Sequence, residues 1–401
     1  MSTTALAQSF TFPTGFQTTN RIVKSALSEG IAEPNGRPSE ALFNLYKRWG
    51  AGGAGILMTG NVMVDKDHLV NANVMIAEEE NFLADYTTLA SHAQAHGTQL
   101  WMQINHPGRQ APFYLDKAPV SASNIKMPSK IYLEPRPLEE EEILDLIERY
   151  GNAALLAKKS GMKGAQIHGA HGYLVSQFLS PLTNVRTDKW GGSLENRARF
   201  VLEIYRNMRK KVGDAFPLGI KINSADFQRG AFTEEESMEV IQMLDQEGMD
   251  LIEVSGGTYE RAAMVGTMQK ESTKRREAYF MDFIVKVRNK IKSPLMLTGG
   301  FRTATSMNKA IENGELDLVG LGRPFCVFPD VAKELINGTR TECGVPDLLT
   351  GVDKIDMSGM LQTPWHQFQL VRMGKGLDPD PEMDVWMVYE KITGKKRPVL
   401  E

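Results

Sequence analysis

Short apolar runs alternate with stretches of helical periodicity along most of the chain. The runs lack the strict apolar–polar alternation of a half-exposed strand, so they are typical of a parallel sheet whose outer face is covered. These predicted strands lie at 21–27, 55–60, 99–105, 164–168, 217–223, 250–256, 294–300 and 317–322. The predicted helices lie at 39–49, 80–97, 139–160, 194–212, 234–247, 278–291, 303–313 and 329–337.

Strands and helices in strict alternation indicate parallel strands joined by crossover helices. We predict an α/β fold, a (β/α)8 TIM barrel. An open doubly wound sheet is the alternative, although no GxGxxG motif follows the first predicted strand. Long connections follow predicted strands three, four and six, at 106–138, 169–193 and 257–277. They leave the carboxyl ends of the strands, where barrel enzymes carry their active sites, and we expect the last of them to cover the site.

The barrel accounts for residues 1–340 and leaves residues 341–401 as a C-terminal extension. The extension carries Trp365, Phe368, Trp386 and Tyr389 among prolines and glycines. Large aromatic side chains are stabilised by burial, so their presence here indicates docking. We expect the extension to pack on the barrel or on a neighbouring subunit.

Composition narrows the classes of function. With 46 basic and 49 acidic residues the net charge is -3, so the chain has no strong electrostatic attraction for nucleic acid or an anionic membrane. Its two cysteines, Cys326 and Cys343, form no CxxC motif, which argues against a cysteine-bound iron–sulfur cluster or a zinc ribbon. We find neither a membrane-spanning apolar stretch nor the pattern of a signal peptide, and we expect a cytoplasmic protein.

The densest group of reactive side chains is HGAHGY, at the end of the fourth predicted strand. The imidazoles of His168 and His171 could donate hydrogen bonds to one substrate oxygen, and the phenol of Tyr173 could act as a general acid. A metal site is an alternative, but no third ligand is evident, and residues 164–187 contain no Asp or Glu. Two buried histidines and a core tyrosine without a catalytic role are the other alternative.

Glycine-rich turns follow predicted strands seven and eight, as TGGF at 298–301 and GLGRP at 320–324. At these two strand ends of a barrel, backbone N–H groups commonly face a phosphate. Arg323 adds a guanidinium, which matches the geometry of a phosphate. Either turn alone is common in proteins, but both together at these strands indicate a ligand that carries a phosphate.

Two polar residues interrupt apolar strands. Lys221 lies between Ile220 and Ile222, where its charge is costly to bury without a partner. It could form a Schiff base, stabilise an anionic cofactor, or extend its amine to solvent, and spacing does not separate these alternatives. Gln103, in WMQIN, could offer a donor and an acceptor to the edge of a heterocycle, although a satisfied core amide is more common.

The segment IHGAHGYLVSQFLSPLTNVRTDKWGGSLENRARF at 167–200 resembles the signature of the old yellow enzyme family, whose members are FMN-dependent (β/α)8 oxidoreductases. The similarity covers about residues 10–340 in the same order. Its further motifs are NRIVKSAL (20–27), GILMTGNV (55–62), QINHPGR (103–109), APVSAS (118–123), the TGG turn and DLVGLGRP.

The resemblance implies bound FMN, with NADH or NADPH as the reductant. It implies that His168 and His171 hold the carbonyl or nitro oxygen of an activated alkene, while Tyr173 donates a proton to the α-carbon. It places Gln103 at the pyrimidine edge of the flavin and Lys221, where Arg is usual, beside the negative charge at N1 and O2. The residues implied around FMN are Ala26, Leu27, Ser28, Asn61, Gln103, Lys221, Gly299, Gly300, Phe301, Gly322 and Arg323.

We therefore expect a single-domain ene-reductase without an iron–sulfur cluster and without a metal site. It would use NAD(P)H to reduce the activated C=C bond of α,β-unsaturated carbonyl or nitro compounds, with hydride from flavin N5 and a proton from Tyr173. The alternatives are flavin-dependent oxidation or dealkylation of an amine, a cofactor-free lyase that uses Lys221, and a metabolite sensor that uses the C-terminal extension. The expected partner is a small-molecule alkene, with no nucleic acid and no membrane; a homodimer or a higher homo-oligomer is one option.

Overall fold

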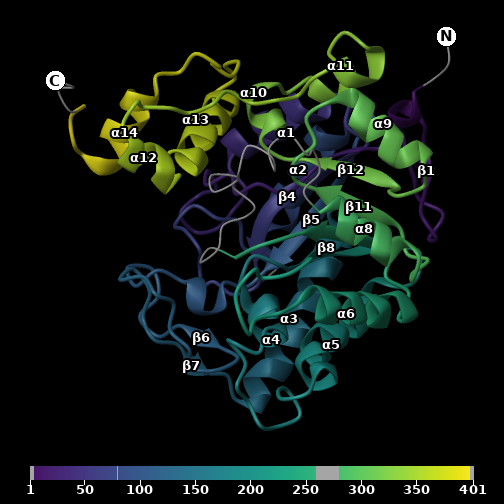
Figure 1. The fold of residues 1–401 in the computed structure, drawn as a ribbon, viewed down its shortest axis with the longest axis vertical. Coiled ribbons are helices and arrows are strands. Elements are labelled where there is room, and N and C mark those ends of the chain that lie inside the picture. Colours follow the sequence, from purple (N-terminus) through teal and green to yellow (C-terminus); the bar gives the residue numbers. More distant parts are fainter. Residues whose placement is uncertain (1–3, 79, 259–279, 398–401) are drawn as a thin grey trace.

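Eight parallel strands close into a barrel in the computed structural model, which describes residues 4–78, 80–258 and 280–397 (Figure 1). This closure confirms the predicted TIM barrel and excludes the open sheet. In spatial order the strands are β3 (Ile22–Lys24), β4 (Ile56–Met63), β5 (Gln99–Asn105), β8 (Gly164–Gly169), β9 (Leu218–Asn223), β10 (Leu251–Ser255), β11 (Leu295–Thr298) and β12 (Leu318–Leu321).

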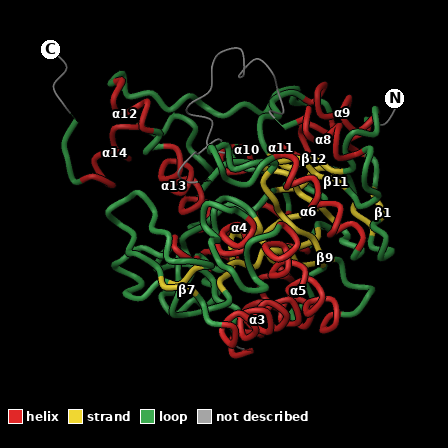
Figure 2. Tube along the Cα trace, turned by 60° about the horizontal axis from the view of Figure 1, so that its bottom comes forward, coloured by secondary structure: helices red, strands yellow, loops and turns green. Residues whose placement is uncertain are grey.

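Helices lie around the barrel and cover its outer face (Figures 1 and 2). They are α1 (Glu40–Gly50), α2 (Leu83–Gln94), α3 (Glu140–Lys159), α5 (Leu194–Val212), α6 (Glu234–Gln246), α8 (Met281–Arg288), α9 (Ala304–Glu312) and α11 (Val331–Asn337). Every residue of β4, β5, β8, β9 and β10 is buried. Burial on both faces explains why the strand sequences show no polar alternation.

Local signals place the helix ends. Ser39 and Ser193 cap α1 and α5, because each side-chain oxygen accepts a hydrogen bond from a backbone N–H in the first turn. Helix α3 begins with three glutamates and ends with two lysines, and both ends suit the helix dipole. Thr233 and Glu236 form a capping box at the start of α6. These ends were predictable because their signals are local.

The amino-terminal end of the barrel is filled by a separate apolar cluster. A short hairpin of β1 (Phe10–Thr11) and β2 (Gln17–Thr18) precedes the barrel. Phe12, which follows β1, contacts the ring of Trp101, with ring centroids 5.2 Å apart. The members of this cluster are Phe12, Val23, Ile56, Met58, Trp101, Leu251, Met296 and Leu318. Because this end is filled with side chains, it is closed, and the opposite end is left for a ligand.

The first predicted strand is shorter than expected. The ladder contains Ile22–Lys24, whereas residues 25–28 leave it and line the cavity described below. An apolar run does not show where strand pairing stops, because pairing depends on the neighbouring strand. The long loop after β5 contains a small sheet of β6 (Val120–Ser121) and β7 (Arg136–Pro137), which the sequence pattern missed. Most of the loop after β10 lies at 259–279, outside the described residues.

Further short helices also went unpredicted. They are the 3₁₀ turns η1 (Ala5–Ala7) and η3 (Gly108–Gln110), with α4 (Leu174–Leu179) and α10 (Pro324–Val327). The 3₁₀ turn η2 (Glu80–Phe82) precedes α2 and lies within the helix predicted at 80–97. Helix α4 directly follows HGAHGY, and Tyr173 is its N-cap residue. The loop after β8 is therefore held in a defined conformation where the histidine cluster lies.

The C-terminal extension, as far as residue 397, forms three helices, α12 (Asp353–Ser358), α13 (Gln362–Gly374) and α14 (Val385–Thr393). They lie together at one side of the barrel (Figure 1). Helix α13 packs on α1 of the same chain: Asn44 donates a hydrogen bond to the carbonyl of Gly374 at 3.2 Å, and Gly374 lies close to Ala41. Trp365 of α13 is fully buried. None of the described helices is both long and apolar enough to cross a membrane.

Candidate active site

A cavity of about 820 Å³ lies at the carboxyl ends of the barrel strands. This volume is within the usual range for cofactor and small-molecule sites. Its wall comes from the ends of β3, β9, β10, β11 and β12, and from residues of the C-terminal extension between 343 and 370. The predicted site residues that line it are Ala26, Leu27, Ser28, His171, Lys221, Gly299, Gly300, Phe301, Gly322 and Arg323.

The other four predicted residues, Asn61, Gln103, His168 and Tyr173, are buried and are not among the residues that line this cavity. Asn61 pairs with Gln103 between β4 and β5, next to an irregularity in the β4 register. His168 pairs with Lys221 between β8 and β9. The strands thus bring Asn61, Gln103 and His168 toward the end of the barrel where the cavity lies, and Tyr173 follows β8 at the same end.

The two glycine turns have backbone conformations that favour glycine. Gly299 and Gly300 have φ angles of 128° and 88°, in the region that side chains disfavour. A Cβ on Gly320 would lie 1.9 Å from Oγ1 of Thr298, which hydrogen-bonds Ser25 at 2.7 Å. Arg323, beside these turns, donates to Oε1 of Gln362 at 3.3 Å. Exposed backbone and a guanidinium thus meet at one end of the cavity, as a phosphate requires.

The histidine cluster is compact. The ring centroid of His168 lies 5.1 Å from that of His171 and 4.9 Å from that of Tyr173. His171 has a φ of 61°, a conformation that is rare for a residue other than glycine. The backbone N–H of His171 donates to Oδ1 of Asn223 at 3.2 Å, and the ring Nε2 of His171 lies 3.0 Å from Oγ of Ser255. Such strain, held by specific contacts, is typical of functional sites.

Both imidazoles of this cluster are neutral at neutral pH. Burial lowers the pKa of His168 and His171 well below the usual value, and the positive charge of Lys221 acts in the same direction. A neutral imidazole still has one N–H to donate. The Nδ1 atom of His168 is buried without a hydrogen-bond partner in the described part of the chain. The cluster can therefore polarise an acceptor oxygen without carrying a full positive charge.

Lys221 has an internal partner. Its Nζ lies 2.9 Å from Oε1 of Glu253, and the two side chains are 5% and 0% exposed. The other carboxylate oxygen accepts a hydrogen bond from Nε2 of Gln166 at 2.7 Å. Gln166 in turn accepts from Nε2 of Gln103 at 2.8 Å. A continuous polar chain therefore crosses the barrel from Lys221 to Gln103.

The remaining wall fits a flat heterocycle that bears a phosphate. Ser28 is held by Asn71 and by Gln367 of α13, each at 3.4 Å. Asn61 Oδ1 is buried and has no hydrogen-bond partner among the described residues, so an acceptor is available to a ligand N–H. A phosphate-compatible turn at one end, a lysine in the wall and amide groups behind it match the donors and acceptors of FMN.

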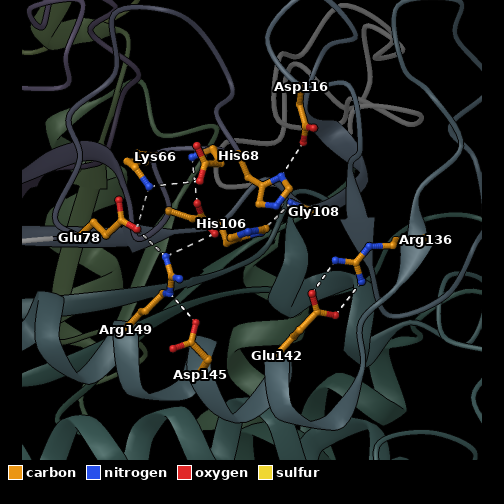
Figure 3. A network of polar contacts seen from close by, with 12 residues as sticks. Lys66, His68, Glu78, His106, Gly108, Asp116, Arg136, Glu142, Asp145 and Arg149 are labelled. Carbon is orange, nitrogen blue, oxygen red and sulfur yellow. Dashed lines mark hydrogen bonds and ion pairs between the residues drawn. The ribbon is translucent and has the colours of Figure 1, made fainter.

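A second group of titratable residues lies outside this cavity. Asp65, His68 and His106 each have a potential metal-ligand atom within 4.8 Å of the others. Figure 3 shows His68 and His106 with the polar residues around them. However, Arg149 lies 3.5 Å from the Asp65 carboxylate, and it also pairs with the carboxylates of Glu78 and Asp145. The acid is therefore already paired with a cation, which disfavours a metal ion there.

The protonation of the two imidazoles in this second group also disfavours a metal. The Gly108 N–H donates to Nδ1 of His106 at 3.0 Å, and burial lowers the pKa of His106 well below the usual value. The neutral ring of His106 therefore carries its proton on Nε2. For His68, burial alone would lower the pKa, but the hydrogen bond and charge of Asp116, 2.6 Å away, outweigh it and raise the pKa. We assign a structural role to this group.

Sequence reasoning missed four polar residues around the cavity: Gln166, Asn223, Ser255 and Glu253. Glu253 gave a usable signal, because it is the single charge inside the buried strand LIEVS at 251–255, as Lys221 is inside PLGIKIN. Two such residues in neighbouring buried strands of a barrel are natural partners. Gln166, Asn223 and Ser255 gave no such signal, because amides and hydroxyls are common in protein cores.

Comparison with known proteins also indicates a flavin-binding barrel. The model of the NADH:flavin oxidoreductase / NADH oxidase family matches residues 10–342. The NADH-dependent flavin oxidoreductase iliE of Hypocrea jecorina is 38% identical over 349 residues, which cover 80% of this chain and 86% of the relative. A 2-naphthoyl-CoA reductase structure aligns with a TM-score of 0.82 at 25% identity, over 94% of this chain and 58% of the other. The old yellow enzyme homologue of Zymomonas mobilis shares the fold, with a TM-score of 0.72 at 22% identity, over 84% of this chain and 94% of the other.

The family match spans the whole barrel, and the cavity fits the cofactor of that family. These findings confirm the predicted resemblance, an enzymatic activity, and the use of FMN with a nicotinamide reductant. The chain belongs to the NADH:flavin oxidoreductase / NADH oxidase family and is a flavin-dependent oxidoreductase with an old-yellow-enzyme barrel.

Proposed function

We propose that this enzyme reduces the activated C=C bond of α,β-unsaturated carbonyl or nitro compounds. The observation that carries the proposal is the cluster of His168, His171 and Tyr173, two neutral imidazoles and a phenol at the cavity end of the barrel. An oxygen acceptor beside two hydrogen-bond donors becomes more electron-withdrawing, which activates a conjugated C=C bond toward hydride.

Each residue has a role in this proposal. His168 and His171 donate hydrogen bonds to the substrate oxygen and stabilise the negative charge that develops on it. Tyr173 gives its phenolic proton to the α-carbon. Bound FMN would supply the redox chemistry of the reaction, the transfer of hydride from the reduced nicotinamide to the β-carbon. Ser255 and Asn223 hold the side chain and backbone of His171, so they keep its ring in position.

The same proposal assigns the cofactor contacts. Gly299, Gly300, Phe301, Gly322 and Arg323 hold the phosphate, because they line the end of the cavity where the glycine turns lie. Residues 26–28 and the polar residues of β4, β5 and β9 would hold the flavin ring. In this assignment Asn61, Gln103 and Lys221 meet the polar edge of the flavin.

The half-reactions test the role of Tyr173. We expect Tyr173→Phe to slow reoxidation of the NADH-reduced enzyme by an enone or nitroalkene about 100-fold or more, the usual effect of a general acid. Flavin reduction by NADH should stay within about twofold of the wild type, because no proton from Tyr173 enters that step. Stopped-flow absorbance measures both rates. Tyr389→Phe, in α14 of the C-terminal extension, is the matched control.

Two results would contradict the proposal. Equal losses in both half-reactions would mean that Tyr173 supports the flavin site and not protonation of the substrate. Reduced wild-type enzyme that enones, imides and nitroalkenes all fail to reoxidise would exclude this substrate class. Reduction of the flavin by a secondary or tertiary amine would then favour amine oxidation.

A further inference from the structure

The ion pair of Lys221 and Glu253 has a consequence for the cofactor. Lys221 lines the cavity, whereas Glu253 lies behind it in β10 and is fully buried. The two strands are neighbours, and the two residues are paired in the ladder. A buried charge at 2.9 Å from its partner is strongly coupled to it, because little solvent screens the pair. The wall of the cavity therefore presents a compensated cation and not a free one.

This compensation changes what a reduced flavin meets. Two-electron-reduced FMN carries negative charge on its pyrimidine ring, and a cation beside that ring stabilises the reduced form. A carboxylate directly behind the cation cancels much of its field at the ring. The reduction potential of the bound cofactor thus depends on Glu253 as well as on Lys221, even though Glu253 does not line the cavity.

The same carboxylate sets the direction of the amide chain. A carboxylate can only accept hydrogen bonds, so Gln166 must turn its NH₂ group toward Glu253. Its carbonyl oxygen then faces Gln103, which must donate with its own NH₂ group. Oε1 of Gln103 is the atom that the chain leaves unused. It is an acceptor, which suits the N3–H of a flavin.

We propose that Glu253 is a positioning residue of the flavin site, which lowers the reduction potential of FMN through Lys221 and fixes the amide orientation of Gln103 through Gln166. The proposal rests on the FMN contacts of the proposed function, and it is independent of the substrate. It needs no contact between Glu253 and the cofactor.

The reduction potential of bound FMN, measured by anaerobic dye equilibration, tests the charge effect. Glu253→Gln leaves Lys221 uncompensated, so we expect reduced FMN to gain at least tenfold in relative affinity over oxidised FMN. For a two-electron couple this is a shift of about 30 mV to more positive potential. Lys221→Met leaves the carboxylate uncompensated and should shift the potential in the opposite direction. Glu312→Gln, which removes an exposed acid from α9, is the matched control for net charge.

A paired replacement keeps the test valid if a lone buried charge prevents folding, which is a known effect of breaking a buried pair. Lys221→Met combined with Glu253→Met removes both charges and keeps side chains of similar length. If the two charges compensate each other, the relative affinity for reduced over oxidised FMN should change less than twofold from the wild type. If Lys221 acted as a free cation, this double variant would show a clear shift to more negative potential, and the proposal would be overturned.

Gln166→Leu separates the relay from the charge. It preserves the ion pair, so the potential should stay near that of the wild type. The leucine cannot accept a hydrogen bond from Gln103, so the orientation of Gln103 is no longer fixed. We therefore expect the dissociation constant of oxidised FMN, measured by fluorescence titration, to rise at least fivefold. Unchanged affinity would overturn the relay, and an unchanged potential in Glu253→Gln would overturn the charge effect. A shift of the same size in Glu312→Gln would also overturn it, because net charge would then explain the result.

The two proposals can fail separately. An enzyme that binds FMN and shows the predicted shifts but does not reduce activated alkenes would contradict the proposed substrate and leave the role of Glu253 intact. If the enzyme reduces activated alkenes but Glu253→Gln does not shift the reduction potential of FMN, the role of Glu253 is contradicted and the proposed substrate class stands.

Discussion

Lys24 is a charged side chain at the end of β3 that has no exposed surface. Its ammonium donates to the carbonyl of Met58 at 2.7 Å and lies 4.2 Å from the ring centroid of Trp49. Burial lowers its pKa to about 8, although the nearby Glu29 acts in the opposite direction. The charge is therefore tolerated by a few specific contacts and carries a cost in the folded state.

This cost predicts a pH dependence of stability. The pKa of Lys24 rises from about 8 in the folded protein to its ordinary 10.5 on unfolding, so between these values the unfolded state binds more protons. The free energy of unfolding should therefore rise with pH across this window, by about 3 kcal/mol at most, relative to Lys24→Met. Denaturant titrations from pH 7 to pH 10.5 measure it. Lys66→Met, at an exposed lysine, should track the wild type, and a parallel profile for Lys24→Met would contradict the prediction.

The function of each residue of the site depends on the contacts of its side chain as well as on its type. His171 and Lys221 were identified from their residue types and positions, but their working state depends on Ser255 and Glu253, which both lie on β10. A charge or an imidazole has no fixed pKa or orientation until its partners are placed. For this reason the candidate residues were predictable, whereas their electrostatics were not.

At the scale of elements, the ends of β3, β11 and β12 form one wall by fitting closely together. Gly320 in β12 allows Ser25 and Thr298 to hydrogen-bond in the space that a side chain would fill. All three residues line the cavity. The glycine of GLGRP is therefore required by packing between strands, whereas Gly299 and Gly300 are required by their backbone angles.

Gly320→Ala tests this packing. The added Cβ would overlap Thr298 Oγ1, so the Ser25–Thr298 hydrogen bond must break and the strand ends must move. We expect a loss of about 1–3 kcal/mol in the free energy of unfolding of the apoprotein, typical of overpacking, and weaker retention of FMN. Gly344→Ala is the control for stability, because its Cβ would meet no atom within 4 Å. If Gly320→Ala is as stable as the wild type, the strand ends can move to make room for the Cβ, and the prediction is wrong.

At the scale of the whole molecule, the C-terminal extension completes the cavity. Residues between 343 and 370 line it, and Gln367 of α13 donates to the carbonyl of Ser28. Helix α13 is held against the barrel by its contact with α1. Within the extension, the indole N–H of Trp365 donates to the carbonyl of Met383 at 3.0 Å. The predicted division into a barrel at 1–340 and an extension at 341–401 stays a prediction about folding units.

Trp365→Ala should loosen the extension. Removing a fully buried tryptophan typically costs about 3–5 kcal/mol, and the loss falls on the contacts that hold α13. We expect faster proteolysis within residues 345–397 and lower FMN retention, with the barrel fragment remaining resistant. Limited proteolysis with mass spectrometry and flavin absorbance measure both effects. Met387→Ala, at a residue of α14 that is 40% exposed, is the control. If both variants resist proteolysis equally well, Trp365 does not hold the extension in place.

The sequence by itself determined the barrel, most helix boundaries and the residues offered to the cavity. It did so because these depend on local signals: apolar runs buried on both faces, caps that hydrogen-bond within one turn, and reactive residues placed at strand ends. HGAHGY and the two glycine turns each lie within a few residues, so their spacing carried the information.

Only the tertiary structure decided which groups act on one another. The pairing of Lys221 with Glu253, the amide chain to Gln103 and the closure of the cavity by α13 join residues far apart in the sequence. Their strength depends on burial and distance, because desolvation and screening set the energy of every charge and hydrogen bond. A pattern along the chain contains neither quantity.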